Sequence, residues 1–298
     1  MTRRRSVAPV VVKFGGELLE DPRRLTALAS SLRRIHGTTP VLPLVIVHGG
    51  GREIDASLAR AGIAKRQIDG LRITDEPTLD VVVGVLAGLI NTRFVAALCA
   101  AGIRAVGLTG ADAGIARVRP APPHASSTGE AVDLGRVGEP VGKSAPALLI
   151  DLCRKGYVPV VSSIGASRDG LLYNVNADIM AAHLAARLKS PRLIIAGSTA
   201  GVLDRKGLTI ADVDGRGVLA LVRDGDATAG MVAKLAACRT AVAGGAREVF
   251  VADGNDLPGL GVLARRGRVS GAANSTRIHA STRAGRAMGD IEGRNWTS

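Results

Sequence analysis

The stretch PLVIVHGGGREIDASLARAG, residues 43–62, joins an apolar run to three adjacent glycines and then to a helix-like segment. The apolar run is typical of a strand buried on both faces, and Gly62 is placed to end the helix. The glycines between them admit three interpretations. They can be the oxyanion loop of an esterase, a cradle for a phosphate or carboxylate, or an ordinary tight turn.

The same alternation of short apolar runs and amphipathic segments continues along the chain. Asp21 and Pro22 mark the start of a helix, as N-cap and first helical residue. We expect strands at 7–16, 41–51, 104–110, 157–165, 192–197 and 247–254, and helices at 21–36, 52–62, 78–102, 144–156, 176–190 and 230–245. The Pro/Ser-rich residues 117–131 are expected to form a mobile loop or a hairpin flap. This order predicts an α/β fold with a mainly parallel central sheet.

Composition and length set the class of protein. The 298 residues are 46% hydrophobic but only 2% aromatic, so the core is expected to consist of Val, Leu, Ile and Ala. No stretch of about 20 residues is apolar throughout, which argues against a membrane span. The apolar run before Lys13 is shorter than the ~7–15 residues of a signal peptide. We therefore expect a soluble, cytoplasmic protein.

The net charge of +13 is carried mostly by arginine. Because these arginines are spread along the chain and few aromatic residues are available for stacking, nucleic-acid binding is not the favoured use. Attraction of small anionic substrates needs fewer assumptions. The cysteines, Cys99, Cys153 and Cys238, are far apart in helix-like contexts, so we expect buried free thiols rather than disulfides or a metal site.

Two glycine clusters follow the first two expected strands, KFGG at 13–16 and HGGG at 48–51. In an open parallel sheet, ligands bind where strands end and helices begin, and glycine lets backbone N–H groups approach an anion. The esterase interpretation fails because the chain has no G-x-S-x-G elbow. GEPVGKS at 138–144 has one residue too few for a P-loop, and no dinucleotide fingerprint follows the first strand. Lys13 before the first cluster favours an anion over a plain turn.

Two further groups of residues carry polar chemistry. Asn174, Asn176 and Asp178 alternate before a helix, so in an extended segment they would point the same way. One of them, such as Asp178, could serve as N-cap, but three exceed what capping needs, which favours a ligand-facing set. Lys234 lies in the first turns of a helix after a glycine-containing turn. Such a lysine is usually a solvated surface charge, but beside a phosphate it can reach the transferred group.

Together these pieces resemble the acetylglutamate kinases of the amino-acid kinase family. The matching pieces, in chain order, are VVKFGGELL, LPLVIVHGGGREID, GLRITDEPTLDVVVGVLAGLINTRFVAAL, VDLGRVGEPV, GYVPVVSSIG, NVNAD and AGMVAKL, over residues 9–278. The resemblance implies phosphorylation of the side-chain carboxylate of N-acetyl-glutamate by ATP and Mg²⁺, in arginine biosynthesis. The metal is expected to be carried mainly by the nucleotide, with no dedicated protein site.

The resemblance also assigns roles. Lys13 and Lys234 would contact the transferred phosphoryl group and the leaving side, and Asp178 would hold both lysines. The acyl-amino-acid site would comprise Gly16, Gly50, Gly51, Arg72, Asn174 and Asn176, with Arg72 gripping the α-carboxylate. The nucleotide site would comprise Gly197, Ser198, Gly201, Leu203, Thr228, Gly230 and Met231. Ser198, Ala229 and Ala233 depart from the family's usual residues, which leaves nucleotide affinity and choice open.

The implied fold is an αβα sandwich with an amino-acid lobe at 1–190, an ATP lobe at 191–278 and a disordered tail at 279–298. Homodimers are common in the family. Because only twelve residues precede Lys13, whereas arginine-inhibited members carry an extra N-terminal helix, we expect a dimer without arginine feedback.

Three alternatives stay open. A kinase of lysine biosynthesis would act on a blocked aminoadipate, and the basic surface would suit an acidic carrier protein bearing that substrate. A non-catalytic sensor would keep the amino-acid lobe and lose ATP use. A nucleic-acid binder would show steeply salt-dependent retention.

Overall fold

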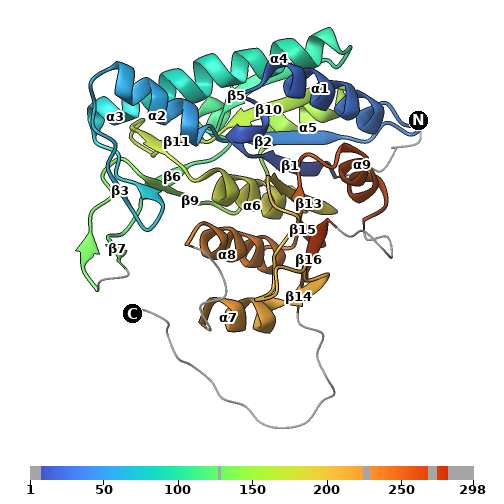
Figure 1. Cartoon of the computed structure of the whole chain (residues 1–298). Coiled ribbons are helices and arrows are strands. Elements are labelled where there is room, and N and C mark those ends of the chain that lie inside the picture. The colour runs from blue at the N-terminus through green and yellow to red at the C-terminus, as the bar shows by residue number, and fades with distance from the viewer. Residues whose placement is uncertain (1–7, 127–128, 224–228, 268–273, 281–298) are drawn as a thin grey trace.

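The computed structural model describes residues 8–126, 129–223, 229–267 and 274–280, and an eight-stranded sheet runs through its centre (Figure 1). The strand order is β14-β16-β15-β13-β1-β2-β10-β5, and every neighbouring pair is parallel except β15 and β16. The strands are β1 (Val10–Phe14), β2 (Leu44–His48), β5 (Ala105–Thr109), β10 (Val158–Ser162), β13 (Arg192–Gly197), β14 (Asp212–Asp214), β15 (Glu248–Asp253) and β16 (Ser275–His279). This confirms the predicted mainly parallel sheet.

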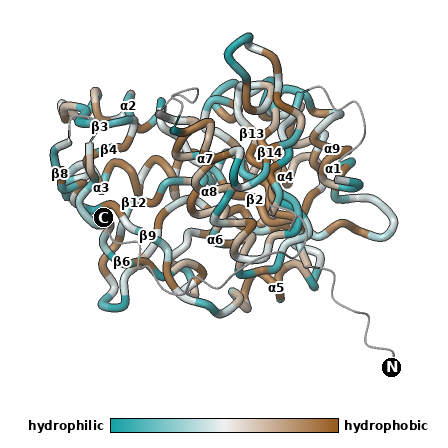
Figure 2. Tube along the Cα trace, turned by 90° about the horizontal axis from the view of Figure 1, so that it is seen from below, coloured by the Kyte–Doolittle hydropathy of each residue, from teal (hydrophilic) through white to brown (hydrophobic). Residues whose placement is uncertain are grey.

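Helices cover both faces of the sheet, so the fold is the predicted αβα sandwich (Figure 1). Alternate residues of β1 face opposite layers: Val10, Val12 and Phe14 belong to one buried cluster and Val11 to the other. The first layer comprises α1 (Pro22–His36), α2 (Gly51–Arg60), α3 (Glu76–Val83), α4 (Asn91–Ala100) and α9 (Leu257–Arg266). The second comprises α5 (Ala147–Arg154), α6 (Ala177–Arg187), α7 (Gly215–Arg223) and α8 (Ala229–Ala243). Apolar residues accordingly concentrate inside and hydrophilic ones along the outer loops (Figure 2).

Local signals in the sequence set several helix ends. The Asp21 carboxylate accepts from the backbone N–H groups of Arg23 and Arg24, and Pro22 is the first residue of α1, as predicted. Gly62 follows α2 with a φ of 69°, which suits glycine after a helix. The strands β1, β2, β5, β10, β13 and β15 and the helices α1, α2, α5, α6 and α8 all lie where the pattern placed them.

The long apolar helix predicted at 78–102 is a continuous helical run from Glu76 to Ala100. It passes through a π-helical segment, η2 (Gly84–Ile90), which the sequence pattern did not indicate. Within the described residues, this one helix is long and apolar enough to cross a membrane. Ile90, Phe94 and Leu98 are nonetheless at most 1% exposed and pack against the sheet. It is a partly buried core helix.

Four small hairpins gather at one end of the molecule (Figure 1). They are β3 (Gln67–Ile68) with β4 (Leu71–Arg72), β6 (Val118–Pro120) with β9 (Gly138–Pro140), β7 (His124–Ala125) with β8 (Ala131–Val132), and β11 (Ile164–Ala166) with β12 (Leu172–Asn174). Short 3-10 turns are η1 (Gly16–Leu18) and η3 (Asp112–Gly114). Strands within 117–131 thus belong to hairpins, one of the two expected forms, while residues 127–128 lie outside the described residues.

Some elements and one burial prediction differ from expectation. No pattern indicated α7, α9, β14 or β16. β16 ends at His279, the first residue of the predicted tail, and residues 281–298 lie outside the described residues. The cysteines are free, but only Cys238 is buried; Cys99 is exposed and Cys153 is intermediate. All described strands of the central sheet after residue 190 lie on one side of β1. The division into two lobes at residue 190 stays a prediction.

Candidate active site

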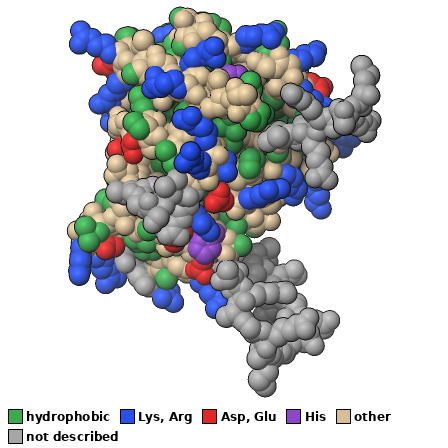
Figure 3. Space-filling model, turned by 90° about the vertical axis from the view of Figure 1, so that its right-hand side faces the viewer, with side chains coloured by type: hydrophobic (Ala, Val, Ile, Leu, Met, Phe, Trp, Pro, Cys, Tyr) green, Lys and Arg blue, Asp and Glu red, His purple; other side chains and the backbone are tan. Residues whose placement is uncertain are grey.

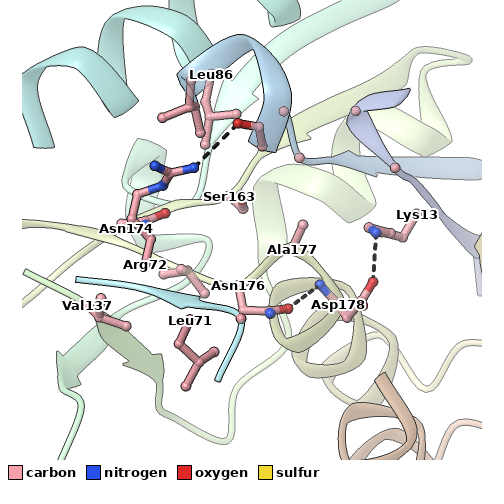
Figure 4. Close-up of a pocket in the computed structure, with 18 of the residues that line it drawn as sticks. Lys13, Leu71, Arg72, Leu86, Val137, Ser163, Asn174, Asn176, Ala177 and Asp178 are labelled. Atoms are coloured by element: carbon pink, nitrogen blue, oxygen red, sulfur yellow. Dashed lines mark hydrogen bonds and ion pairs between the residues drawn. The ribbon is translucent and has the colours of Figure 1, made fainter. Parts of the chain in front are cut away.

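A cavity of about 290 Å³ lies where β1 and β2 end. Its wall combines the turns after these strands with the β3–β4 hairpin, the long helix and the start of α6 (Figure 4). The residues that line it are Lys13, Gly15, Gly16, Glu17, Gly49, Gly50, Gly51, Ile54, Gly70, Leu71, Arg72, Leu86, Val137, Ser163, Asn174, Val175, Asn176, Ala177 and Asp178. Every catalytic or acyl-site residue predicted from the sequence is in this set except Lys234.

Lys234 nevertheless belongs to the same constellation, because Asp178 bridges the two predicted lysines. Lys13 Nζ lies 2.8 Å from Asp178 Oδ1, and Lys234 Nζ lies 3.0 Å from Asp178 Oδ2. The three side chains come from β1, α6 and α8, and none is more than 15% exposed. Burial alone would raise the pKa of Asp178, but the two ammonium groups lower it to about 2. The carboxylate is therefore a fixed negative charge between two positive ones.

The polar run before α6 is arranged differently from the expected extended segment. Asn176, not Asp178, is the N-cap: its Oδ1 accepts from the backbone N–H groups of Asp178 and Ile179. The helix begins at Ala177, so Asp178 lies in its first turn and turns toward Lys13 (Figure 4). Asn174 ends strand β12. All three polar residues still line the cavity, because the strand-to-helix turn passes along its wall.

The two glycine clusters touch each other through their backbones. A Cβ on Gly16 would lie 2.6 Å from the Gly50 Cα, and a Cβ on Gly50 would lie 2.0 Å from the Ile90 Cδ1. Close approach therefore explains glycine at both positions without any ligand. At Gly51 nothing lies within 4 Å of an added Cβ, so packing does not require glycine there. Among the described residues no side chain caps the start of α2, where Gly50 and Gly51 line the cavity.

A buried polar pair supports the second glycine cluster from behind. His48 is fully buried; its Nδ1 lies 3.3 Å from the Gly49 carbonyl oxygen, and its Nε2 lies 3.0 Å from Asn91 Nδ2. Since the Asn91 amide donates, Nε2 accepts and Nδ1–H donates to Gly49. Asn91 also donates to the Val160 carbonyl. Burial lowers the pKa of His48 to about 4, so the imidazole is neutral near pH 7.

Arg72 enters the opposite side of the cavity from β4. Its Nη2 donates to Asp55 Oδ1 and lies 3.4 Å from the Gly51 carbonyl oxygen. Its Nη1 is buried and has no hydrogen-bond partner among the described residues. A buried guanidinium nitrogen left open beside a cavity favours an anionic guest. Asn174 Nδ2 lies 3.3 Å from Thr74 Oγ1, which in turn donates to the Arg72 carbonyl oxygen.

The described residues of the predicted nucleotide site do not line this cavity; they lie at the end of β13, in the loop after it and at the start of α8. Gly197 ends β13, next to β1, and a Cβ there would come within 3.7 Å of the Glu17 carboxylate. Gly201 has a φ of 92° and faces Thr276, so its glycine has a structural cause. Met231 packs on the core beside Gly230 at the start of α8. Ser198 and Leu203 are exposed in the loop after β13, and Thr228 lies outside the described residues.

Sequence reasoning missed three side chains around the site. Asp55 binds Arg72, and its helical spacing of four from Gly51 could have placed it on the cavity face of α2. Glu17 lines the cavity directly after KFGG, where its position in the motif was the available signal. Asn91, which holds His48, gave no local signal because their contact joins residues 43 positions apart.

Comparison with known proteins adds an independent finding. Residues 8–253 match the model of the amino acid kinase family. The chain is 38% identical over 248 residues to acetylglutamate kinases of Burkholderia mallei (strain SAVP1) and Burkholderia thailandensis. Each alignment covers 82% of this chain and 81% of the relative.

Solved structures share the fold at lower identity. An N-acetylglutamate synthase from Neisseria gonorrhoeae, complexed with coenzyme A and N-acetyl-glutamate, superimposes with a TM-score of 0.76 at 22% identity. The match covers 92% of this chain but only 60% of the synthase. Carbamate kinase from Giardia lamblia bound to AMP-PNP gives a TM-score of 0.66 at 17% identity, covering 93% and 99% of the two chains.

Proposed function

This chain belongs to the amino acid kinase family, and we propose that it transfers the γ-phosphoryl group of ATP to the side-chain carboxylate of N-acetyl-L-glutamate. The observation that carries the proposal is the Lys13–Asp178–Lys234 bridge at the end of a cavity that also holds Arg72. It is supported by the similarity to curated acetylglutamate kinases. The product is an acyl phosphate of the kind formed in arginine biosynthesis.

The chemical difficulty is the approach of two anions. A carboxylate oxygen forms a bond to phosphorus while the bond from phosphorus to the ADP oxygen breaks. The acceptor carboxylate is ionised at neutral pH, so no general base is needed. Catalysis then depends mainly on positioning the reactants and on stabilising the negative charge of the transition state. Lys13 reaches the transferred group, Lys234 reaches the leaving side, and Asp178 fixes their separation. The N–H groups of Gly16 and Gly50 donate to the phosphoryl oxygens as charge builds on them.

The acyl amino acid occupies the other end of the cavity. Arg72 grips the α-carboxylate with Nη1, which has no partner among the described residues, since a planar guanidinium suits that group. Asn174 and Asn176 line the same wall, and the open space at Gly51 receives the acyl-amino end. Free glutamate carries a positive amino group in place of the acyl amide, which this site, already holding Arg72, disfavours.

ATP occupies the segment after β13 and the start of α8. The proposed contacts are Gly197, Ser198, Gly201, Leu203, Thr228, Gly230 and Met231. Mg²⁺ bound with the nucleotide neutralises charge on the phosphate oxygens. A Giardia carbamate kinase of the same fold is described with AMP-PNP bound. The amino-acid lobe comprises residues 1–190 and the ATP lobe residues 191–278 in this proposal. We also propose that the enzyme is a cytoplasmic homodimer.

A coupled assay of ADP release with three acceptors tests the substrate. We expect kcat/KM to be highest for N-acetyl-L-glutamate and about 10–200-fold lower for N-acetyl-aminoadipate, because one methylene is worth that much. Free glutamate should release little ADP. A higher kcat/KM for the aminoadipate would contradict the assignment and favour the lysine-type kinase.

Calorimetry separates the kinase from a sensor. A kinase binds both N-acetyl-L-glutamate and the AMP-PNP–Mg²⁺ complex. Heat with the acyl amino acid alone, and none with the nucleotide, would favour the non-catalytic reading motivated by Ser198 and Ala229.

A further inference from the structure

The Glu17 carboxylate is the one acidic group of the cavity wall that has no partner among the described residues. The wall carries two acids, Glu17 and Asp178. Asp178 is neutralised by Lys13 and Lys234. Glu17, in contrast, makes no hydrogen bond, and no described lysine, arginine or histidine nitrogen lies within 4 Å of it. It is partly buried, in the first turn after KFGG.

The position of this carboxylate is well defined by its neighbours. A Cβ placed on Gly15 would lie 2.3 and 2.4 Å from its two oxygens, so the carboxylate is folded over bare glycine backbone. A Cβ placed on Gly197 would lie 3.7 Å from it. Gly15 donates its N–H to the carbonyl of Ala196; it directly follows β1, and Gly197 ends the neighbouring strand β13. Glu17 therefore lies between the acyl cavity and the segment proposed to hold ATP.

An unpaired carboxylate at this point conflicts with a bound polyphosphate unless a cation separates them. Mg²⁺ is usually held by one or two carboxylates together with substrate phosphates, and it keeps several waters. The described residues contain no group of three His, Cys, Asp or Glu side chains that could hold a metal ion by themselves. A single carboxylate that completes the coordination of a nucleotide-borne cation fits this composition.

We propose that Glu17 is a protein ligand, directly or through a metal-bound water, of the divalent cation that accompanies the nucleotide. The proposal rests on the proposed kinase function and refines it, because there the metal was carried by the phosphates. It implies that Glu17 repels metal-free nucleotide and attracts the metal complex. The enzyme's preference for the metal-bound form would then reside largely in one side chain.

The test measures AMP-PNP affinity with excess Mg²⁺ and with a chelator, in the full chain, for wild type and Glu17→Gln. The substitution keeps the side-chain shape and removes the charge. We expect a crossed result: the variant binds the Mg²⁺ complex more weakly and metal-free AMP-PNP more tightly. The ratio of the two affinities should fall about tenfold or more. Electron paramagnetic resonance can follow Mn²⁺ titrated into the enzyme–AMP-PNP complex. Mn²⁺ should bind correspondingly more weakly to the complex of Glu17→Gln than to that of the wild type.

Two further variants bracket the result. Glu20→Gln removes a nearby carboxylate that pairs with Arg52 outside the cavity, and it should leave the ratio unchanged. Glu17→Asp keeps a charge and should retain part of the metal preference. An unchanged ratio in Glu17→Gln, or tighter binding of both nucleotide forms, would overturn the metal-ligand role. Absence of nucleotide binding by wild type in both conditions would instead overturn the proposed kinase function.

Discussion

At the residue scale, the site depends on charges that the fold holds in place rather than on a group that exchanges protons. Asp178, with a pKa of about 2, stays ionised at any pH where the protein works. It separates Lys13 from Lys234 and orients both, although the three belong to different elements. The catalytic proposal therefore predicts that charge at these positions matters more than pH.

Removing either end of this bridge should lower turnover strongly. We expect Lys234→Ala and Asp178→Asn each to reduce kcat by about 10²–10³, as the loss of one preorganised electrostatic contact does. Steady-state ADP release measures the effect, and circular dichroism checks the fold. Lys155→Ala removes an exposed lysine after α5 and should keep wild-type kcat. Near-full activity in both site variants would show that the roles are assigned wrongly.

The buried His48 should make stability depend on pH. Burial lowers its pKa from 6.5 to about 4, so the folded state resists a proton that the unfolded chain takes up. Stability is then full above pH 6.5 and is lost as pH falls toward 4, by about 3 kcal/mol at 1.36 kcal/mol per unit. Urea unfolding between these pH values measures it. His48→Gln should flatten the dependence, although His183, with a similarly lowered pKa, leaves part of it. The same slope in both proteins would refute this account.

At the element scale, the glycine turns were predictable, but the reason for each glycine was not. KFGG and HGGG were identified from their place after two apolar strands. The sequence could not show that Gly16 meets Gly50 backbone to backbone, whereas Gly51 borders open space. Nor could it indicate the π segment η2, which brings Ile90 against Gly50 and Leu86 into the cavity wall. Both facts depend on contacts distant in sequence.

Gly16 and Gly51 should respond differently to substitution by alanine. Gly16→Ala puts a Cβ 2.6 Å from backbone, so the two turns must separate; we expect kcat to fall at least about tenfold and stability to drop. Gly51→Ala meets nothing within 4 Å and should keep the fold and kcat while raising KM for the acyl amino acid. Steady-state kinetics and the melting temperature, measured for both variants and the wild type, test this difference. Equal effects on kcat and stability would contradict the packing argument.

The long helix offers the face on which we expect two copies to meet. Gly84, Gly88, Leu89, Thr92 and Ala96 are exposed along it, and Leu89 is 45% exposed. Arg93, which pairs with Glu53, is also exposed one turn after Leu89, but the rest of this face is mainly apolar, as is typical of an interface. Leu89→Arg should shift the protein from dimer to monomer in sedimentation, because it places a charge in the contact. Leu219→Arg, at a 53% exposed leucine of α7, should remain dimeric. A monomeric wild type would contradict the dimer.

At the scale of the whole molecule, periodicity was sufficient for the sandwich and its parallel sheet. Continuous Val/Ile/Leu runs can be buried only between two helical layers, and β1, β2, β10 and β13 obey this. The apolar pattern did not indicate α7, α9, β14 or β16. These elements are short, or turn residues interrupt their apolar spacing. The sequence predicted more of the site residues than of the elements in the second half of the fold. Asp55, Glu17 and the His48–Asn91 pair still needed coordinates, since they act on residues from other elements.

The surface agrees with small anionic substrates better than with nucleic acid. Lysine and arginine side chains are spread over the face in Figure 3 among uncharged and apolar ones, with acidic groups between them. A nucleic-acid site would be expected to concentrate them along one stripe. The cavity, in contrast, has both Lys13 and Arg72 in its wall.

We propose that a phosphoryl group is joined to a carboxylate in this cavity. Hydroxylamine trapping detects the expected product, because hydroxylamine converts an acyl phosphate into a stable hydroxamate. With N-acetyl-L-glutamate and ATP–Mg²⁺, we predict one hydroxamate for each ADP released. Release of ADP without hydroxamate would contradict the account.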